Sequence, residues 1–486
     1  MQSLHVAPRR LGSVSVRSFL QKAPRRLFST KPPSPGSRAS GNGSTTSKGY
    51  IAIGTAVAGA SGVWWLNKSR SSNDIPSLNT QIVSSSPFSP EHVTAALSKD
   101  AYSVPVSNVP GVARYDGAQV PSNSPCEDRF IHGRFSSPRG DGSDWLAWAV
   151  FDGHAGWQTA NLLEDQLLPA VRHSLSEVIP SSTPEGLNAT VQSAITKAFI
   201  SLDDAIMRTA ATTVSSDQPL QDKMRKLLPG YAGSCALLAL FDPVTSTLYV
   251  ACTGDSRAVL GRKASPSGRW EATPLSVDQN GSNAEEIARI SAEHPGEDSI
   301  AKGGRVLGLA VSRAFGDGRW KWPMDLQEDL RNRFQGLRPL TGRYNVLTPP
   351  YLTAEPVVTV TTIERGVPSF LVMASDGLWD FVSNQQAVDL TGKWLETPAP
   401  RSKSGGSPAP AAKPLNFGQL GNDVSERFVD ERTTVVDDNA AVHLVRNALG
   451  GKDQQLLAGR LAVQAPFSRN IRDDTTVQVI FFTGST

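Results

Sequence analysis

Several apolar runs in this chain stop at an acidic residue beside a glycine. Three runs, each long enough for one buried strand, end in this way: residues 145–151 before Asp152, 248–252 before Asp255, and 370–374 before Asp376. Short apolar runs bounded by glycine turns are typical of strands in a protein core. The alternating segment 476–482 predicts a further strand, and Asp473 comes just before it. The pattern therefore predicts four carboxylates at the ends of strands.

Carboxylates at the rim of a β-sheet suit a hard divalent cation such as Mg²⁺ or Mn²⁺, because these ions take oxygen ligands. A single Asp-Gly after a strand is more often an ordinary turn, but four such residues in one chain favour a metal site. The pair Glu127-Asp128 lies shortly before Asp152 and would add carboxylates to the same rim. The sequence contains no H-E-x-x-H motif, so a zinc hydrolase of that type is not indicated.

Helical and strand patterns follow one another through the rest of the domain. Residues 156–179 and 185–209 carry helical apolar spacing, and residues 234–241 have the composition of a strand. We expect strands 248–252 and 257–260 to form a hairpin through a tight glycine turn. Hairpins between helical segments favour an α+β fold with antiparallel sheets over a parallel Rossmann sheet.

Seven short motifs resemble, in their order, those of the metal-dependent type-2C Ser/Thr protein phosphatases. They lie at residues 126–129, 151–156, 233–234, 253–257, 309–317, 374–380 and 472–477. The resemblance covers roughly residues 110–484 and implies a four-layer αββα sandwich of two antiparallel sheets flanked by helices. Residues 123–129 most resemble the mitochondrial branch that includes the pyruvate dehydrogenase phosphatases. The implied partner is therefore a phosphoprotein, with the pyruvate dehydrogenase complex as the candidate.

The same resemblance implies a role for each acidic residue. Two Mg²⁺ or Mn²⁺ ions would be held by five residues: Asp152 as the bridge, Glu127 and the carbonyl of Gly153 on one ion, and Asp376 with Asp473 on the other. Asp255 matches a position that, with Asp376, holds a weaker third ion. Asp128 would hold metal-bound water, and Asp474 would be a neighbour outside the ligand set.

This constellation implies hydrolysis of phosphoserine and phosphothreonine by a metal-activated hydroxide. Two cations about 4 Å apart lower the pKa of a shared water toward neutrality, and Asp152 would be catalytic as their bridge. His154 is the candidate general acid for the leaving alkoxide, because an imidazole pKa lies near 6.5. Many relatives carry a phosphate-binding Arg four residues before the metal-binding Glu, where this chain has Asn123. Arg129 or Arg313 could take its place.

The N-terminal segment has a composition of its own. Residues 1–48 contain Arg, Lys and Ser but no Asp or Glu, which is typical of a mitochondrial transit segment. A disordered basic tail for nucleic acid is the alternative, but interspersed apolar residues such as Leu11, Phe19 and Phe28 disfavour it. We therefore expect mitochondrial localisation and no nucleic-acid partner.

The uncharged segment 49–66 is a candidate transmembrane helix. It has about the length that a bilayer requires and ends at Trp64-Trp65, with Lys68 and Arg70 beyond. A cleaved import sorting element is the alternative. If it spans the inner membrane, the preceding positive charge would place the catalytic domain in the intermembrane space, whereas a pyruvate dehydrogenase substrate requires the matrix. Both compartments stay open.

The remaining segments complete the expected organisation. Residues 67–104, rich in Ser and Pro, predict a flexible linker, and the phosphatase domain would occupy residues 105–486 with a disordered insertion near 396–416. The three cysteines, at 126, 235 and 252, are too few for a disulfide framework. The alternative function is a catalytically silent, membrane-tethered scaffold that keeps the fold and binds phosphoproteins.

Overall fold

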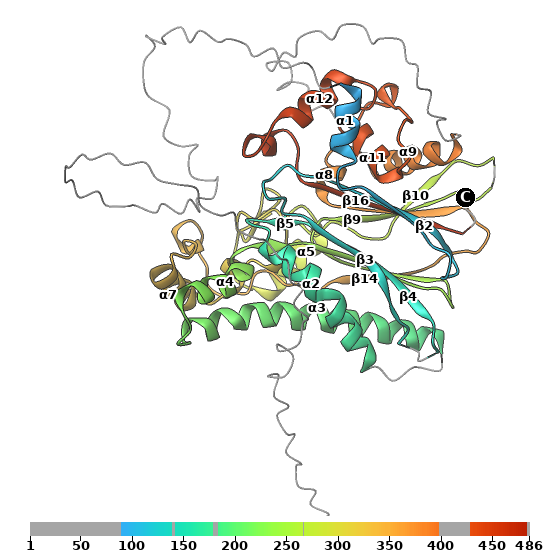
Figure 1. Cartoon of the computed structure of the whole chain (residues 1–486). Coiled ribbons are helices and arrows are strands. Elements are labelled where there is room, and N and C mark those ends of the chain that lie inside the picture. The colour runs from blue at the N-terminus through green and yellow to red at the C-terminus, as the bar shows by residue number, and fades with distance from the viewer. Residues whose placement is uncertain (1–88, 139–140, 178–182, 266, 398–427, 484–486) are drawn as a thin grey trace, which may run out of the picture. The chain divides into compact units, whose positions relative to one another are not determined.

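The computed structural model describes residues 89–138, 141–177, 183–265, 267–397 and 428–483 (Figure 1). The segments 1–48 and 49–66 therefore lie outside the described residues, as does most of the insertion expected near 396–416. Among the helices that are described, none combines the length and hydropathy of a bilayer crossing. Within residues 67–104, the predicted linker, the structure has a helix, α1 (Pro90–Leu97), and most of a strand, β1 (Tyr102–Pro105).

Two large antiparallel sheets form the centre of the described structure. The six-stranded sheet has the order β1, β2 (Val112–Val120), β16 (Thr475–Phe482), β15 (Ser369–Ala374), β9 (Arg257–Arg262) and β10 (Glu271–Pro274). The five-stranded sheet has the order β14 (Val357–Thr362), β8 (Thr247–Thr253), β7 (Ala236–Asp242), β4 (Asp144–Phe151) and β3 (Arg129–Ser136). The antiparallel α+β prediction is confirmed.

Two smaller sheets lie beside them. One joins β13 (Phe315–Gly316), β6 (Gly233–Ser234) and β5 (Gly153–His154), and the other pairs β11 (Ala301–Lys302) with β12 (Arg305–Val306). The first of these brings together chain segments that are far apart in sequence, because β6 pairs with both β5 and β13.

The predicted hairpin between β8 and β9 is wrong. The two strands belong to different sheets: β8 pairs with β7 and β14, whereas β9 pairs with β15 and β10. The chain passes from one sheet to the other at Gly254, whose φ of 108° few side chains tolerate. A hairpin and a change of sheet both begin with a tight turn between two apolar strands, so the local pattern does not separate them.

Helices cover the outer face of each large sheet (Figure 1). The helices α1, α9 (Asn384–Glu396), α11 (Ala440–Ala448) and α12 (Gln454–Ala462) pack on the six-stranded sheet. The helices α2 (Gln158–Ser176) and α3 (Pro184–Val214) pack on the five-stranded sheet. The remaining helices are α4 (Leu220–Tyr231), α5 (Ala284–Glu293), α6 (Gly318–Lys321), α7 (Met324–Phe334), α8 (Asp376–Trp379), η2 (Leu340–Gly342), η3 (Asp430–Arg432) and η4 (Phe467–Asn470).

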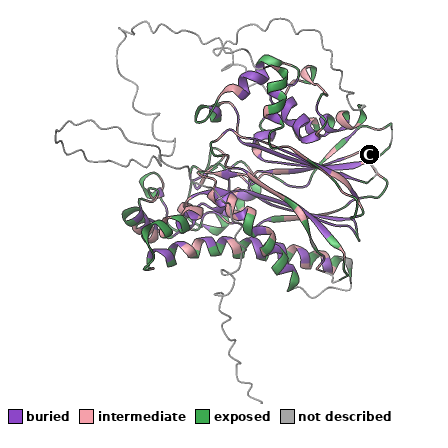
Figure 2. Ribbon diagram, in the orientation of Figure 1, coloured by how far each residue is buried: buried purple, intermediate pink, exposed green. Residues whose placement is uncertain are grey.

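Strand β4 shows why the central runs are apolar at every position. Its side chains alternate between two clusters: Trp145 and Ala147 face α2 and α3, whereas Leu146 and Trp148 face the other sheet. Residues 145–151 are buried on both faces and have no solvent side, so they are all apolar, whereas Asp144 at the start of the strand is exposed. Figure 2 shows the resulting burial along the strands and on the helix sides that face them.

A buried ion pair joins α11 to the loop that precedes it. Asp437 accepts two hydrogen bonds of 2.7 Å from Arg446 of α11, and both side chains are almost fully buried. We predict that Asp437→Ala lowers the free energy of unfolding by about 3–5 kcal/mol, because it leaves a buried guanidinium without its carboxylate. The measurement is urea unfolding followed by circular dichroism. The exposed pair of Arg333 and Asp329 provides the control, since Asp329→Ala should cost at most about 1 kcal/mol.

Candidate metal centre

The predicted carboxylates lie where the two large sheets meet at one end. Asp152 stands between β4 and β5, and Asp255 at the change of sheet between β8 and β9. Asp376 begins α8, directly after β15, and Asp473 comes just before β16. The sequence predicted one rim of a single sheet, but β4 and β8 belong to one sheet and β15 and β16 to the other. The acidic cluster therefore joins the two sheets.

Crowding of negative charge dominates the electrostatics of this cluster. Burial, followed by the charges of Asp376, Asp128 and Asp255, raises the pKa of Asp152 well above its ordinary value. Burial and the charge of Asp255 raise the pKa of Asp376 to about 8. Burial also raises the pKa of Asp255. Carboxylates that are buried together with too little positive charge repel one another, and a divalent cation would remove that repulsion.

Two carboxylate oxygens of the cluster lack a hydrogen-bond partner within the described part of the chain. Oδ1 of Asp376 and Oδ1 of Asp128 are buried without a hydrogen-bond donor among the residues that the structure describes. A buried acceptor without a donor costs free energy unless an ion or water satisfies it. The donor set of carboxylate oxygens therefore fits Mg²⁺ or Mn²⁺, which prefer oxygen ligands.

The backbone at Gly153 lies directly against the segment that carries Glu127. A Cβ atom at Gly153 would collide with the carbonyl oxygen of Glu127, so only glycine permits this approach. Burial, with the charge of Asp474, raises the pKa of Glu127. Glu127 therefore lies beside Gly153 and close to the carboxylate of Asp474.

Asp474 organises the loop that carries Glu127. Its two carboxylate oxygens accept four hydrogen bonds of 2.5 to 3.0 Å, from the backbone of Ser122, Asn123 and Glu127 and from the side chain of Asn123. The sequence placed Asp474 only as a neighbour of the ligands. The structure gives it a definite task, because it fixes the backbone from which Glu127 projects. The side chain of Asn123 is held by Asp474, because its Nδ2 donates to Oδ2 of that residue.

Two hydroxyl groups hold the side chain of Asp128. Its Oδ2 accepts hydrogen bonds from Ser375 Oγ at 2.8 Å and Thr476 Oγ1 at 2.7 Å. Burial, with the charge of Asp474, raises its pKa to about 7. One oxygen is thus fixed by two hydroxyl groups, and the other, Oδ1, is the atom without a donor.

His154 has a partner that sequence analysis missed. Its Nε2 lies 2.7 Å from Oδ2 of Asp317, which is almost fully buried. Burial lowers the pKa of His154, but the charge and the hydrogen bond of Asp317 outweigh that effect, and the net shift is upward. Strand β6 pairs with β5 and with β13, and so brings these two residues together. The only local signal was that Asp317 belongs to one of the recognised motifs.

The two arginines proposed for phosphate binding are both engaged in the structure. Arg313 is buried, binds Glu286 through two nitrogens and donates to the carbonyl of Glu355 at 2.8 Å. Arg129 donates to the carbonyls of Cys126 and Asp128 at 2.8 and 2.7 Å.

A third arginine, which sequence analysis missed, lies closer to the acidic cluster. Arg469 of η4 contacts the carboxylate of Asp473, and its side chain is 48% exposed. Its positive charge opposes the effect of burial on the pKa of Glu127 and of Asp376. The spacing of four residues before Asp473 was the only sequence signal, and it is common between charged residues in any protein.

Comparisons with known proteins identify the family of the chain. The protein phosphatase 2C family matches residues 119–413. A protein phosphatase 2C homolog of Schizosaccharomyces pombe is 38% identical over 445 residues, which cover 89% of this chain and 95% of that protein. The mitochondrial [pyruvate dehydrogenase [acetyl-transferring]]-phosphatase 1 of Saccharomyces cerevisiae is 34% identical, covering 76% of this chain and 69% of its own length. Its human counterpart is 30% identical, covering 81% and 83%.

Among solved structures, a serine-threonine phosphatase 2C from Toxoplasma gondii is 20% identical with a TM-score of 0.46, covering 79% of this chain and 98% of that one. A score below 0.5 adds nothing to the assignment, which follows from the sequence comparisons. The chain belongs to the protein phosphatase 2C family and is a protein serine/threonine phosphatase. Members of this family generally depend on Mg²⁺ or Mn²⁺.

The raised pKa values predict how stability depends on pH. In the metal-free protein the pKa is about 7 for Asp128 and about 8 for Asp376, against about 3.9 for an unfolded Asp. Between these values the folded state binds more protons than the unfolded state, so stability falls as pH rises. We expect the Tm of the chelated protein to be lower at about pH 8 than at about pH 6, and Mn²⁺ to restore it. A Tm that rose over this interval would contradict the crowding described above.

Proposed function

We propose that the chain removes phosphate from phosphoserine and phosphothreonine in mitochondrial proteins, with the pyruvate dehydrogenase complex as the substrate. The observation that carries the hydrolytic part is the buried acidic cluster contributed by both sheets, with an unpartnered oxygen on Asp376. The substrate and the compartment are supported by the yeast and human relatives, whose names state both, and by the acid-free N-terminal segment.

The proposed ligands divide into two groups. Asp152 would contribute to the binding of both ions. Glu127 and the Gly153 carbonyl would help to hold one ion, and Asp376 and Asp473 would help to hold the other. Bound Mg²⁺ or Mn²⁺ would supply positive charge for the phosphoryl oxygens and a water of lowered pKa. Asp255 contributes to a third, weaker site, and Asp128 positions water through its free oxygen.

His154 donates the proton that the leaving serine or threonine oxygen requires. Asp317 supports this role, because a hydrogen-bonded carboxylate holds the imidazole in one orientation and favours its protonated form. The imidazole has two nitrogens that can carry the donated proton, Nε2 and Nδ1. Of these, Nε2 is hydrogen-bonded to Asp317. Nδ1 is therefore the atom left to serve the leaving group.

Arg469 binds the substrate phosphate in place of the arginine that relatives carry at the position of Asn123. Its side chain is half exposed, and its guanidinium contacts Asp473, a proposed metal ligand. To bind phosphate, Arg313 would have to break its hydrogen bonds to the buried carboxylate of Glu286. Arg129 would have to break its hydrogen bonds to two backbone carbonyls. These two remain the alternatives.

The alternative function, a silent phosphoprotein-binding scaffold, is not favoured, because every carboxylate of the proposed centre is present. The direct test is turnover of phosphorylated pyruvate dehydrogenase by the purified protein with Mn²⁺ and with EDTA. Release of phosphate only with Mn²⁺ supports the enzyme. Binding without release in either condition would leave the scaffold. Protease protection in intact mitochondria, and after opening of the outer membrane, tests whether the domain lies in the matrix.

Loss of a bridging ligand should abolish activity and leave the fold intact. We predict that Asp152→Asn removes nearly all Mn²⁺-dependent turnover, because it takes one negative charge from both proposed ions. The measurement is phosphate release from a phosphothreonine peptide. Asp204→Asn, at an exposed carboxylate of α3, is the matched control and should behave as the unmodified protein. Equal rates for the two variants would remove Asp152 from the site.

The general acid should matter only for a poor leaving group. We predict that His154→Ala lowers turnover of phosphopeptides by about 10²-fold or more and that of aryl phosphates far less, because a phenolate leaves without a proton. Asp317→Asn should show the same selectivity in a weaker form. Comparing kcat for the two substrate classes checks this, and an equal loss on both would argue against proton donation by His154.

The phosphate-binding arginine can be identified by product inhibition. We predict that Arg469→Ala raises both the KM for a phosphopeptide and the inhibition constant of inorganic phosphate by roughly 10- to 100-fold, the value of one charged hydrogen bond. Arg129→Ala is the comparison, and it should alter phosphate inhibition little. The reverse ranking of the two variants would assign the role to Arg129.

A further inference from the structure

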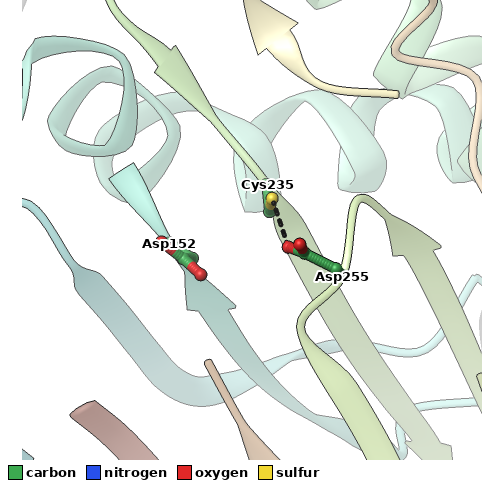
Figure 3. A group of neighbouring side chains, drawn as sticks. All are labelled: Asp152, Cys235 and Asp255. Carbon is green, nitrogen blue, oxygen red and sulfur yellow. Dashed lines mark hydrogen bonds between the residues drawn. The ribbon is translucent and has the colours of Figure 1, made fainter. Parts of the chain in front are cut away.

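A buried thiol faces the proposed metal ligands. One donor atom each from Asp152, Cys235 and Asp255 lie within 4.8 Å of one another (Figure 3). The Sγ atom of Cys235 lies 3.3 Å from Oδ1 of Asp255, to which it donates a hydrogen bond. Cys235 stands between β6 and β7, and its side chain is buried. The acidic cluster thus contains one sulfur donor, which the oxygen-only ligand set proposed above does not use.

The backbone holds this thiol in place. The N–H of Cys235 donates to the carbonyl of Asp152 at 2.8 Å, which ties the two residues together. A Cβ atom at Gly254 would collide with the Cys235 sulfur, so the glycine beside Asp255 provides the space that the thiol occupies. Behind the sulfur lie the apolar side chains of Val311 and Ala314. The thiol therefore has an apolar side and a side that faces carboxylates.

The other buried cysteine differs in this respect. Cys252 of β8 lies in the apolar cluster between the sheets, and its Sγ is directed to the backbone carbonyls of Gly254 and Ser256 at 3.7 and 3.4 Å. A cysteine in such surroundings is a small core residue. Cys235 and Cys252 are thus a matched pair, equally buried but with different neighbours.

One sulfur with two carboxylates is a donor set that prefers borderline or soft ions. Mg²⁺ selects oxygen ligands, whereas Zn²⁺ and Cd²⁺ gain from a thiolate. Tetrahedral Zn²⁺ with bonds of about 2.3 Å to sulfur and 2.1 Å to oxygen places these donors about 3.6 Å apart. The observed 3.3 Å between the Cys235 sulfur and Asp255 is close to that value.

We propose that Asp152, Cys235 and Asp255 form a site for a thiophilic divalent ion such as Zn²⁺, which displaces the activating ions and inhibits the phosphatase. Binding converts the thiol to a thiolate and releases its proton to solvent. The inhibition rests on the proposed function, because it requires Asp152 and Asp255 to serve the activating ions as well. The binding itself does not depend on catalysis.

The test uses the full purified chain, freed of metal, and Cd²⁺ as a spectroscopic probe. A thiolate bound to Cd²⁺ gives an ultraviolet charge-transfer absorption that carboxylate ligands do not give. We expect the band to appear with the unmodified protein and with Cys252→Ser and Cys126→Ser, and to be absent with Cys235→Ser. Competition with Cd²⁺ should show that Cys235→Ser binds Zn²⁺ at least about 10- to 100-fold more weakly than the unmodified protein. Loss of a residue that only orients a metal ligand already lowers metal affinity by that factor.

Inhibition provides the second measurement. With Mn²⁺ present, Zn²⁺ should inhibit the unmodified protein and Cys252→Ser at similar concentrations. For Cys235→Ser, inhibition is measured relative to the zinc-free rate of that variant. It should require a Zn²⁺ concentration at least about tenfold higher. A charge-transfer band that persists in Cys235→Ser, or equal inhibition of all variants, would overturn the proposal.

Folding and function are controlled separately. Thermal unfolding of Cys235→Ser and Cys235→Ala establishes that each variant is folded before binding is measured. If the band depends on Cys235 but no variant releases phosphate with Mn²⁺, the proposed function fails and the binding site stands. If turnover is present but the Cd²⁺ band is missing or arises from another cysteine, the thiophilic site fails and the proposed function stands.

Discussion

Mutual repulsion among buried carboxylates is the constraint on which this structure depends. Asp152, Asp255 and Asp376 all have raised pKa values, and for each of them burial is the largest cause. The two sheets pack through a continuous apolar cluster, and that packing holds the acidic residues together against their repulsion. Part of the free energy gained by packing the apolar core therefore offsets the repulsion among these carboxylates. Without that packing the acidic residues would separate. Such a region is predisposed to bind cations.

A layer of polar residues around the cluster determines how its members are oriented. Asp474 fixes the loop of Glu127, the hydroxyls of Ser375 and Thr476 hold Asp128, and Asp317 holds His154. Each of these contacts joins residues more than a hundred positions apart. The site is thus rigid because separate parts of the chain constrain one another, and not because any one loop is stiff.

The sequence predicted what depends on local pattern. The strands that end at Asp152, Asp255 and Asp376 were found from apolar runs bounded by glycine, and α2 and α3 from helical spacing. Sequence analysis failed where the same local pattern is compatible with different strand pairings. At Gly254 the chain passes from one sheet to the other, and the strands on either side do not form a hairpin. Helix α1 was missed because its Ser- and Pro-rich surroundings resemble a linker, although Val93 and Leu97 are fully buried. Asp317 contacts His154 from 163 residues away, which no local pattern encodes. The four-residue spacing of Arg469 and Asp473 is local, but it is too common to indicate a site.

The position of β16 has a consequence for how the protein is made. This strand lies in the middle of the six-stranded sheet, between β2 and β15, and it follows Asp473 and Asp474 directly. A nascent chain that has not yet released these residues from the ribosome lacks the central strand, one proposed metal ligand and the carboxylate that shapes the Glu127 loop. The acidic cluster can therefore be complete only after β16 has joined the six-stranded sheet.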